Sequence, residues 1–165
     1  MKKILIAIVS LLFAGNLVAQ NATLPQNIAL RTLDGESVQS SVIKNDGKPV
    51  IISFWATWCK PCNLELNNIK EVYEEWQEET GVKLVAVSID DARSANRVKP
   101  HVEANDWPYE VYLDQNRDFA RALNAGNNPP YTYLINGEGE IVWQHTGYLP
   151  GAEDELIEKV RELLK

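Results

Sequence analysis

The two cysteines of this 165-residue chain stand close together, in the segment Trp58-Cys59-Lys60-Pro61-Cys62. Two thiols separated by two residues can close into a small-loop disulfide and open again by exchange with another disulfide. Because stabilisation by a disulfide grows with the length of the loop that it closes, this pair is a poor structural staple. The spacing therefore favours a redox-active pair, and a purely structural disulfide is the alternative.

The flanking segments place Cys59 where a strand ends and a helix begins. Residues 50–55 form a nearly continuous apolar run, which is typical of a strand in the centre of a covered sheet. Residues 61–79 carry apolar side chains at helical spacing, and Pro61 suits the first helical turn. The N–H groups at a helix N-terminus stabilise a thiolate, and cysteines placed there have pKa values below the ordinary value of about 8.5. We therefore expect a reactive Cys59.

The N-terminus resembles an export signal. Lys2 and Lys3 precede an apolar run over residues 4–14, which is shorter than the roughly 20 residues of a membrane-spanning helix. We expect a signal peptide over residues 1–19 and one domain over residues 20–165. The alternative is an N-terminal membrane anchor that is not cleaved. Export would place the cysteine pair outside the reducing cytosol, in the periplasm.

The charge balance argues against nucleic acid as a partner. The formal net charge of the chain is −7, and loss of Lys2 and Lys3 with the signal would make it −9. Nucleic-acid binding calls for a basic surface, and no polybasic membrane-binding patch is present in the sequence. His101 and His145 are isolated and have no metal-like spacing, so we expect no metal site.

The order of the remaining elements predicts an α/β fold. We expect strands over residues 28–32, 82–89 and 109–113, a hairpin over 131–135 and 141–146, and helices over 92–105, 118–123 and 153–164. Pro100 should kink or split the helix that contains it, and Asp90 with Asp91 can cap that helix. Strands that alternate with helices predict a central mixed sheet with helices on both faces.

The chain resembles the exported TlpA/ResA-like thiol-disulfide oxidoreductases of the thioredoxin superfamily. The matching residues are Phe54 to Cys62 with Glu65, Val87 to Asp90, Pro130 to Asn136, Gly139 to Val142, and Gly147-Tyr148. The resemblance covers nearly all of the chain after the signal and implies a thioredoxin-like fold. It also implies that an exposed Cys59 is the nucleophile and that Cys62 is the resolving thiol, with no cofactor beyond their disulfide.

The same resemblance implies that Pro130 forms a cis peptide bond beside the cysteines and borders a substrate groove. Pro129 departs from the family pattern, because a proline has no N–H to offer to an extended substrate. We also expect Trp58, Lys60 and Pro61 to contact the substrate. Lys60 either favours the thiolate or is an ordinary exposed lysine. Tyr131 either borders the groove or packs within its strand.

Glu65 matches an acidic residue that this group places three positions after the second cysteine. A partly buried carboxyl group there would raise the thiol pKa and move protons during exchange. The alternative is an acid that favours the first turn of the helix. Ser53 stands where thioredoxin has a buried aspartate and cannot accept a proton in that way, which makes Glu65 the better candidate.

The resemblance implies a reductant of protein disulfides, with apocytochrome c cysteines among the targets and a membrane thiol protein as electron donor. The alternatives are a net oxidant or disulfide isomerase, a peroxiredoxin, a non-catalytic binding domain, and a module in which two thiolates hold a soft metal ion.

Overall fold

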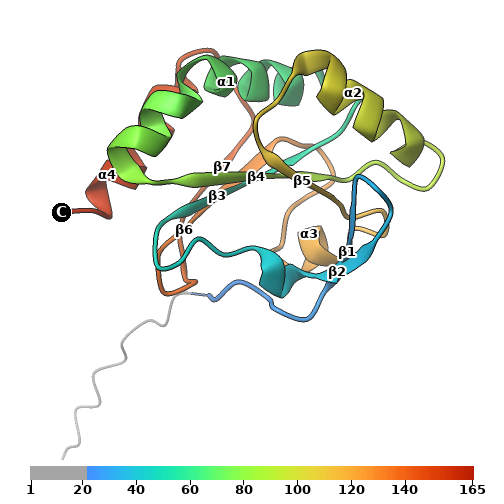
Figure 1. Ribbon diagram of the computed structural model, residues 1–165, viewed down its shortest axis with the longest axis horizontal. Helices are drawn as coiled ribbons and strands as arrows, with labels where there is room; N and C mark the ends of the chain where they lie inside the picture. Colours follow the sequence, from blue (N-terminus) through green and yellow to red (C-terminus); the bar gives the residue numbers. More distant parts are fainter. Residues whose placement is uncertain (1–21) are drawn as a thin grey trace, which may run out of the picture.

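The computed structural model describes residues 22–165, which are built around one mixed sheet (Figure 1). Its strands are β1 (Ala29–Thr32), β2 (Ser37–Gln39), β3 (Val50–Trp55), β4 (Lys83–Ser88), β5 (Glu110–Leu113), β6 (Tyr131–Ile135) and β7 (Ile141–Thr146). The helices are α1 (Lys60–Thr80), α2 (Val98–Asn105), α3 (Asp118–Ala122) and α4 (Ala152–Glu162), with short 3-10 helices η1 (Ser40–Val42) and η2 (Ala95–Arg97). The expected signal peptide, residues 1–19, lies outside the described residues.

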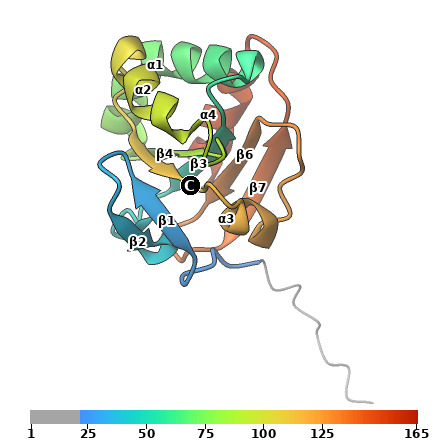
Figure 2. The ribbon, with the colours of Figure 1, turned by 90° about the vertical axis from the view of Figure 1, so that its right-hand side faces the viewer.

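The strands are arranged in the order β2-β1-β5-β4-β3-β6-β7. β3, β4 and β5 run parallel in the middle of the sheet, whereas β6, β7, β1 and β2 pair antiparallel on the two sides. α1, α2 and α4 cover one face and α3 covers the other, as both ribbon views show (Figures 1 and 2). This confirms the predicted mixed sheet with helices on both faces.

β3 explains why both faces of the sheet must be covered. All six of its residues are buried, and successive side chains point to opposite faces. Phe54 packs with Phe119 on the α3 side, with ring centroids 5.6 Å apart. Trp55 packs with Trp107 on the opposite face, at 4.7 Å. The apolar run that predicted a central strand therefore supplies the core of both layers.

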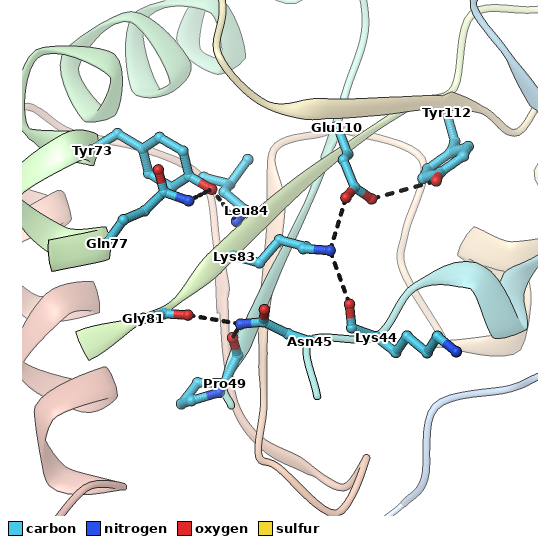
Figure 3. A network of polar contacts seen from close by, with 10 residues as sticks. All are labelled: Lys44, Asn45, Pro49, Tyr73, Gln77, Gly81, Lys83, Leu84, Glu110 and Tyr112. Carbon is cyan, nitrogen blue, oxygen red and sulfur yellow. Dashed lines mark hydrogen bonds and ion pairs between the residues drawn. The ribbon is translucent and has the colours of Figure 1, made fainter. Parts of the chain in front are cut away.

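A polar network fixes the end of the sheet where β3 and β4 begin (Figure 3). The side-chain amide of Asn45 donates to the carbonyl oxygens of Pro49 at 2.9 Å and Gly81 at 2.8 Å. Lys83, at the start of β4, pairs with Glu110 of β5 at 2.8 Å. These contacts tie together the starts of β3, β4 and β5, and the cysteine pair follows the other end of β3.

Two predictions of the local structure need correction. The expected helix over residues 92–105 begins only at Ala95, as the 3-10 helix η2, which runs directly into α2; Pro100 does not split it. Pro100 is the third residue of α2, within the first turn, where its missing N–H leaves no bond unmade. β2 was not predicted, because its three residues give too short a pattern to identify. None of the helices in residues 22–165 is long and apolar enough to cross a membrane.

Candidate active site

Cys59 and Cys62 form a disulfide at the junction that the sequence predicted. Cys59 is the N-cap of α1, four residues after β3 ends, and Cys62 lies in the first helical turn. Their Cα atoms are 5.3 Å apart. The backbone N–H of Cys62 points at the sulfur of Cys59, at an N···S distance of 3.3 Å. A helical N–H therefore faces the Cys59 sulfur, where it would stabilise negative charge after reduction.

Asp90 anchors the loop that leads to Cys59. Its carboxylate is fully buried and accepts hydrogen bonds from the backbone N–H of Thr57 at 2.8 Å and from the Thr57 hydroxyl at 2.7 Å. Ser88 donates a third, at 2.9 Å. The prediction that Asp90 caps the following helix is wrong; only Asp91 bonds to the backbone there. The available signal was the position of Asp90 directly after a buried strand, at the sheet edge that carries Cys59.

Asn63 and His101 form a second support that sequence reasoning missed. The side-chain amide of Asn63 donates to the carbonyl oxygen of Cys59 at 2.9 Å, and its oxygen lies 2.6 Å from Nε2 of His101. The imidazole packs against Trp55 and Trp107, each at 5.4 Å between ring centroids. Partial burial lowers the pKa of His101, which favours a neutral ring that donates from Nε2. His101 therefore packs against the aromatic core and holds Asn63 in place.

The disulfide is less accessible than the sequence indicated. The expected exposed Cys59 is only 5% exposed in the oxidised protein, and Cys62 is fully buried. The Cys59 sulfur lies 3.4 Å from the carbonyl oxygen of Pro129. A disulfide sulfur carries no proton, so this is a close contact and not a hydrogen bond. Trp58 is 58% exposed and offers the large apolar surface beside the sulfur.

The segment opposite the cysteines contains the Pro129–Pro130 peptide bond, which is cis. The carbonyl oxygen of Pro130 accepts a hydrogen bond from the N–H of Gly147 at 2.9 Å, which ties the segment to the chain after β7. Tyr131 is half buried, and its phenol lies so close to Gly126 that a Cβ there would be 2.0 Å from the phenol oxygen. The phenol of Tyr131 therefore packs against the loop that leads to Pro129.

Glu65 lies beyond the first turn of α1, so its interpretation as a first-turn acid is wrong. Its side chain is 4% exposed. One carboxylate oxygen accepts from the Thr132 hydroxyl at 2.7 Å, and the other lies 3.5 Å from the Ser53 hydroxyl. Burial raises the pKa of Glu65 to about 7, although both hydrogen bonds favour the charged form. A carboxyl group that titrates near neutral pH is suited to proton transfer.

The structure places the other expected substrate contacts around the same junction. Lys60 and Pro61 are the first two residues of α1, and both are exposed. Trp55 is fully buried in the core. Within residues 22–165 no group of three or more His, Cys, Asp or Glu side chains could hold a metal ion.

Comparison with known proteins agrees with this geometry. The family model described as AhpC/TSA matches residues 18–144. The chain belongs to the AhpC/TSA family. Among its relatives is the thiol-disulfide oxidoreductase ResA of Halalkalibacterium halodurans, which is 32% identical over 154 residues, 93% of this chain and 82% of the relative.

Solved structures of similar proteins share the fold. A thioredoxin-like protein from Porphyromonas gingivalis is 52% identical, with a TM-score of 0.74 over 87% of this chain and 93% of that chain. StoA from Bacillus subtilis is 25% identical, with a TM-score of 0.63 over 87% of this chain and 100% of that chain. This AhpC/TSA member therefore has a thioredoxin-like fold and is a thiol-disulfide oxidoreductase.

Proposed function

We propose that this protein is exported and reduces disulfides of extracytoplasmic proteins with the dithiol form of Cys59 and Cys62. One observation carries the proposal: the only cysteine pair of the chain is a disulfide at the N-terminus of α1, with the buried Glu65 one turn further along the same helix. The name of the ResA relatives supports exchange with disulfides. The direction of exchange follows from the surroundings of Cys59.

The reaction needs two sulfur exchanges. The Cys59 thiolate attacks one sulfur of the substrate disulfide; a Cys59–substrate disulfide forms, and the other substrate sulfur leaves as a thiolate. The Cys62 thiolate then attacks the Cys59 sulfur, so that the Cys59–Cys62 disulfide forms and the first substrate sulfur leaves. The substrate gains two electrons and two protons, and the enzyme loses them. Reduction by a membrane thiol protein restores the dithiol.

The surroundings of Cys59 favour a reductant over an oxidant. A strongly oxidising disulfide has a reduced form that is stabilised, typically as a thiolate. Here the sulfur is nearly buried and lies against the carbonyl oxygen of Pro129, and both features disfavour negative charge on it. The N–H of Cys62 is the single hydrogen-bond donor that the described residues direct at this sulfur. A less stabilised thiolate corresponds to a dithiol that gives up its electrons more readily.

Glu65 supplies proton transfer in this proposal. With a pKa of about 7, its carboxyl group is protonated in part of the molecules at neutral pH and ionised in the rest. The carboxylate form can take the proton of Cys62 as that thiol becomes the attacking group, and the carboxylic acid form can return it. The hydroxyl groups of Thr132 and Ser53 hold the carboxyl group in place in both states.

Substrate recognition is proposed to use the surface around the disulfide. Trp58, Lys60 and Pro61 would contact the substrate from the α1 side, and Pro129, Pro130 and Tyr131 from the opposite side. Pro129 has no N–H, and its carbonyl oxygen is directed at Cys59, so the substrate would depend on side chains and on the remaining carbonyl groups. Protein disulfides, including those of apocytochrome c, are the proposed substrates.

The proposed location follows from the sequence of the N-terminus. Residues 1–19 would direct export and be removed, and residues 20–165 would form the mature thioredoxin-like domain in the periplasm. An uncleaved anchor would leave the same domain on the outer side of the membrane. The formal charge of −7 and the absence of a basic run agree with protein partners and not with nucleic acid.

Trapping of the mixed disulfide tests the proposal. A Cys62→Ser variant lacks the thiol that releases the substrate, so we expect it to accumulate covalent adducts with protein substrates through Cys59. Cys59→Ser is the matched control and should form none. Reduction of insulin disulfides by the wild-type dithiol should proceed, and both variants should lose it. Adducts that form through Cys62 in the control variant, or wild-type protein that leaves insulin intact, would contradict the assignment.

A further inference from the structure

A hollow of about 530 Å³ is lined on one side by Trp58, the residue that precedes Cys59. We call it the arginine hollow, and its lining residues are Trp58, Ile89, Asp91, Arg93, Ser94, Arg97 and Arg117. We propose that the arginine hollow binds acidic side chains of the protein substrate near the cysteine that exchanges with Cys59. This inference rests on the proposed function and adds the substrate class that the site prefers.

The position of the arginine hollow is set by the sheet. Trp58 follows β3, Ile89 and Arg93 follow β4, and Arg117 follows β5, so each contribution comes from the loop after a parallel strand. Ligands of open α/β sheets bind outside the carboxyl ends of the parallel strands. Cys59 belongs to the same loop as Trp58. A substrate bound at the disulfide therefore has the hollow within reach of its neighbouring residues.

The charge of the arginine hollow is opposite to that of the whole chain. The chain has a formal net charge of −7, yet three arginines line this one hollow. Its single carboxylate, Asp91, is already paired with Arg93 at 2.8 Å and accepts bonds from the N–H and hydroxyl of Ser94. Arg97 is exposed and has no carboxylate of residues 22–165 within ion-pair distance. An unpaired cation therefore remains for a ligand.

Arg117 adds a second cation and a link to the proline segment. Its guanidinium group donates to two neutral acceptors, the carbonyl oxygen of Gly126 and the side-chain oxygen of Asn127, the latter at 3.2 Å. Both acceptors lie in the segment that leads to Pro129. Neutral acceptors leave the positive charge of Arg117 uncompensated. Arg117 thus links the hollow to the segment that leads to Pro129.

An acidic peptide segment fits this chemistry best. Guanidinium groups bind carboxylates in a planar, two-point arrangement, and the exposed indole of Trp58 gives apolar cover to the peptide beside them. A phospholipid or nucleic-acid surface carries dense negative charge over a wide area, which the acidic remainder of this chain would repel. A short acidic run close to a cysteine avoids that repulsion, because it contacts the hollow alone.

Two peptides of equal length, each closed by one internal disulfide, test the inference. One carries aspartates beside the cysteines, and the other carries asparagines at the same positions. The rate at which the reduced protein opens each disulfide is measured after acid quenching. We expect the acidic peptide to react about two- to fivefold faster at low salt, which is the range of an exposed ion pair, and the preference to shrink as salt is added.

Arg97→Gln should make the protein open the acidic and the asparagine peptide at nearly the same rate. Lys99→Gln is the matched control, since Lys99 lies two residues away, carries the same charge and pairs with Asp34 outside the hollow at 2.7 Å. Equal rates for both peptides with the wild-type protein, or an equal loss of preference in both variants, would overturn the inference while exchange itself remains. Failure to open either peptide would overturn the proposed function and the inference with it.

Discussion

The buried carboxyl group of Glu65 predicts an unusual dependence of stability on pH. Its pKa in the folded protein is about 7, against 4.5 for an ordinary glutamate. The folded state therefore binds this proton more tightly than the unfolded state does. The resulting stabilisation is fully present below about pH 4.5, declines as the pH rises toward 7, and is absent above it. Glu65→Gln removes the titrating group and should remove the decline.

The size of the effect follows from the shift. Each pKa unit corresponds to about 1.36 kcal/mol, so raising the pKa from 4.5 to about 7 corresponds to about 3 kcal/mol between acidic and neutral pH. That is a large part of the 5–15 kcal/mol, roughly, by which a domain is stable. The effect should be measured on the oxidised protein, because the disulfide removes both thiols from the titration.

Urea unfolding of wild type and Glu65→Gln at several pH values between about 4 and 8 provides the measurement. The difference in unfolding free energy between the two proteins should change by about 3 kcal/mol across that range, in favour of the variant at the upper end. Glu75→Gln is the matched control, because Glu75 lies on the same helix with an exposed side chain. Parallel curves for wild type and Glu65→Gln would refute the buried, titrating carboxyl group.

Three further substitutions test neighbouring contacts. Thr132→Val removes the hydroxyl that donates to Glu65 at 2.7 Å, so the pKa of Glu65 should rise further and the stability decline should extend to higher pH in the same urea series; an unmoved decline would contradict this. Pro129→Thr restores a backbone N–H and should lower KM for a disulfide peptide; an unchanged KM would refute the role given to Pro129. Gly137→Ala places a Cβ 2.1 Å from the backbone oxygen of Gly47 and should lower the unfolding free energy by about 1–3 kcal/mol. Glu138→Ala is the control, because Glu138 is exposed, and it should leave the unfolding free energy almost unchanged.

The fold was largely predictable because its strongest sequence signals are local. The apolar run over residues 50–55 gives β3 with the predicted bounds, and the hairpin strands β6 and β7 also begin and end where the pattern indicated. β3 and β6 bury nearly all of their side chains, and the turn residues 136–139 mark the hairpin that joins β6 to β7. β2, with three residues, has no periodicity to read and is defined by its pairing with β1.

The supports of the candidate site were less predictable because they join distant parts of the chain. Asp90 bonds to Thr57 across 33 positions, and His101 contacts Asn63 across 38. A sequence shows residue types at these positions but not which partners the fold brings to them. The near burial of Cys59 has the same origin, since the covering carbonyl group belongs to Pro129, 70 positions later.

The role of Glu65 was predictable only in part from the sequence. Its position three residues after Cys62 marked it as a candidate, and its helix placed it one turn along. Its raised pKa, however, depends on burial beneath β3 and β6, which supply Ser53 and Thr132. Helical spacing alone does not distinguish a buried glutamate from the exposed ones that follow it on α1.

The reduction potential of the Cys59–Cys62 pair tests the central claim most directly. The protein is equilibrated in thiol–disulfide buffers of known potential, and the fractions of dithiol and disulfide are measured after alkylation. A nearly buried sulfur beside a carbonyl group predicts a potential at or below about −230 mV, in the range of reductants such as thioredoxin. A value near −120 mV, typical of a strong oxidant, would contradict the account.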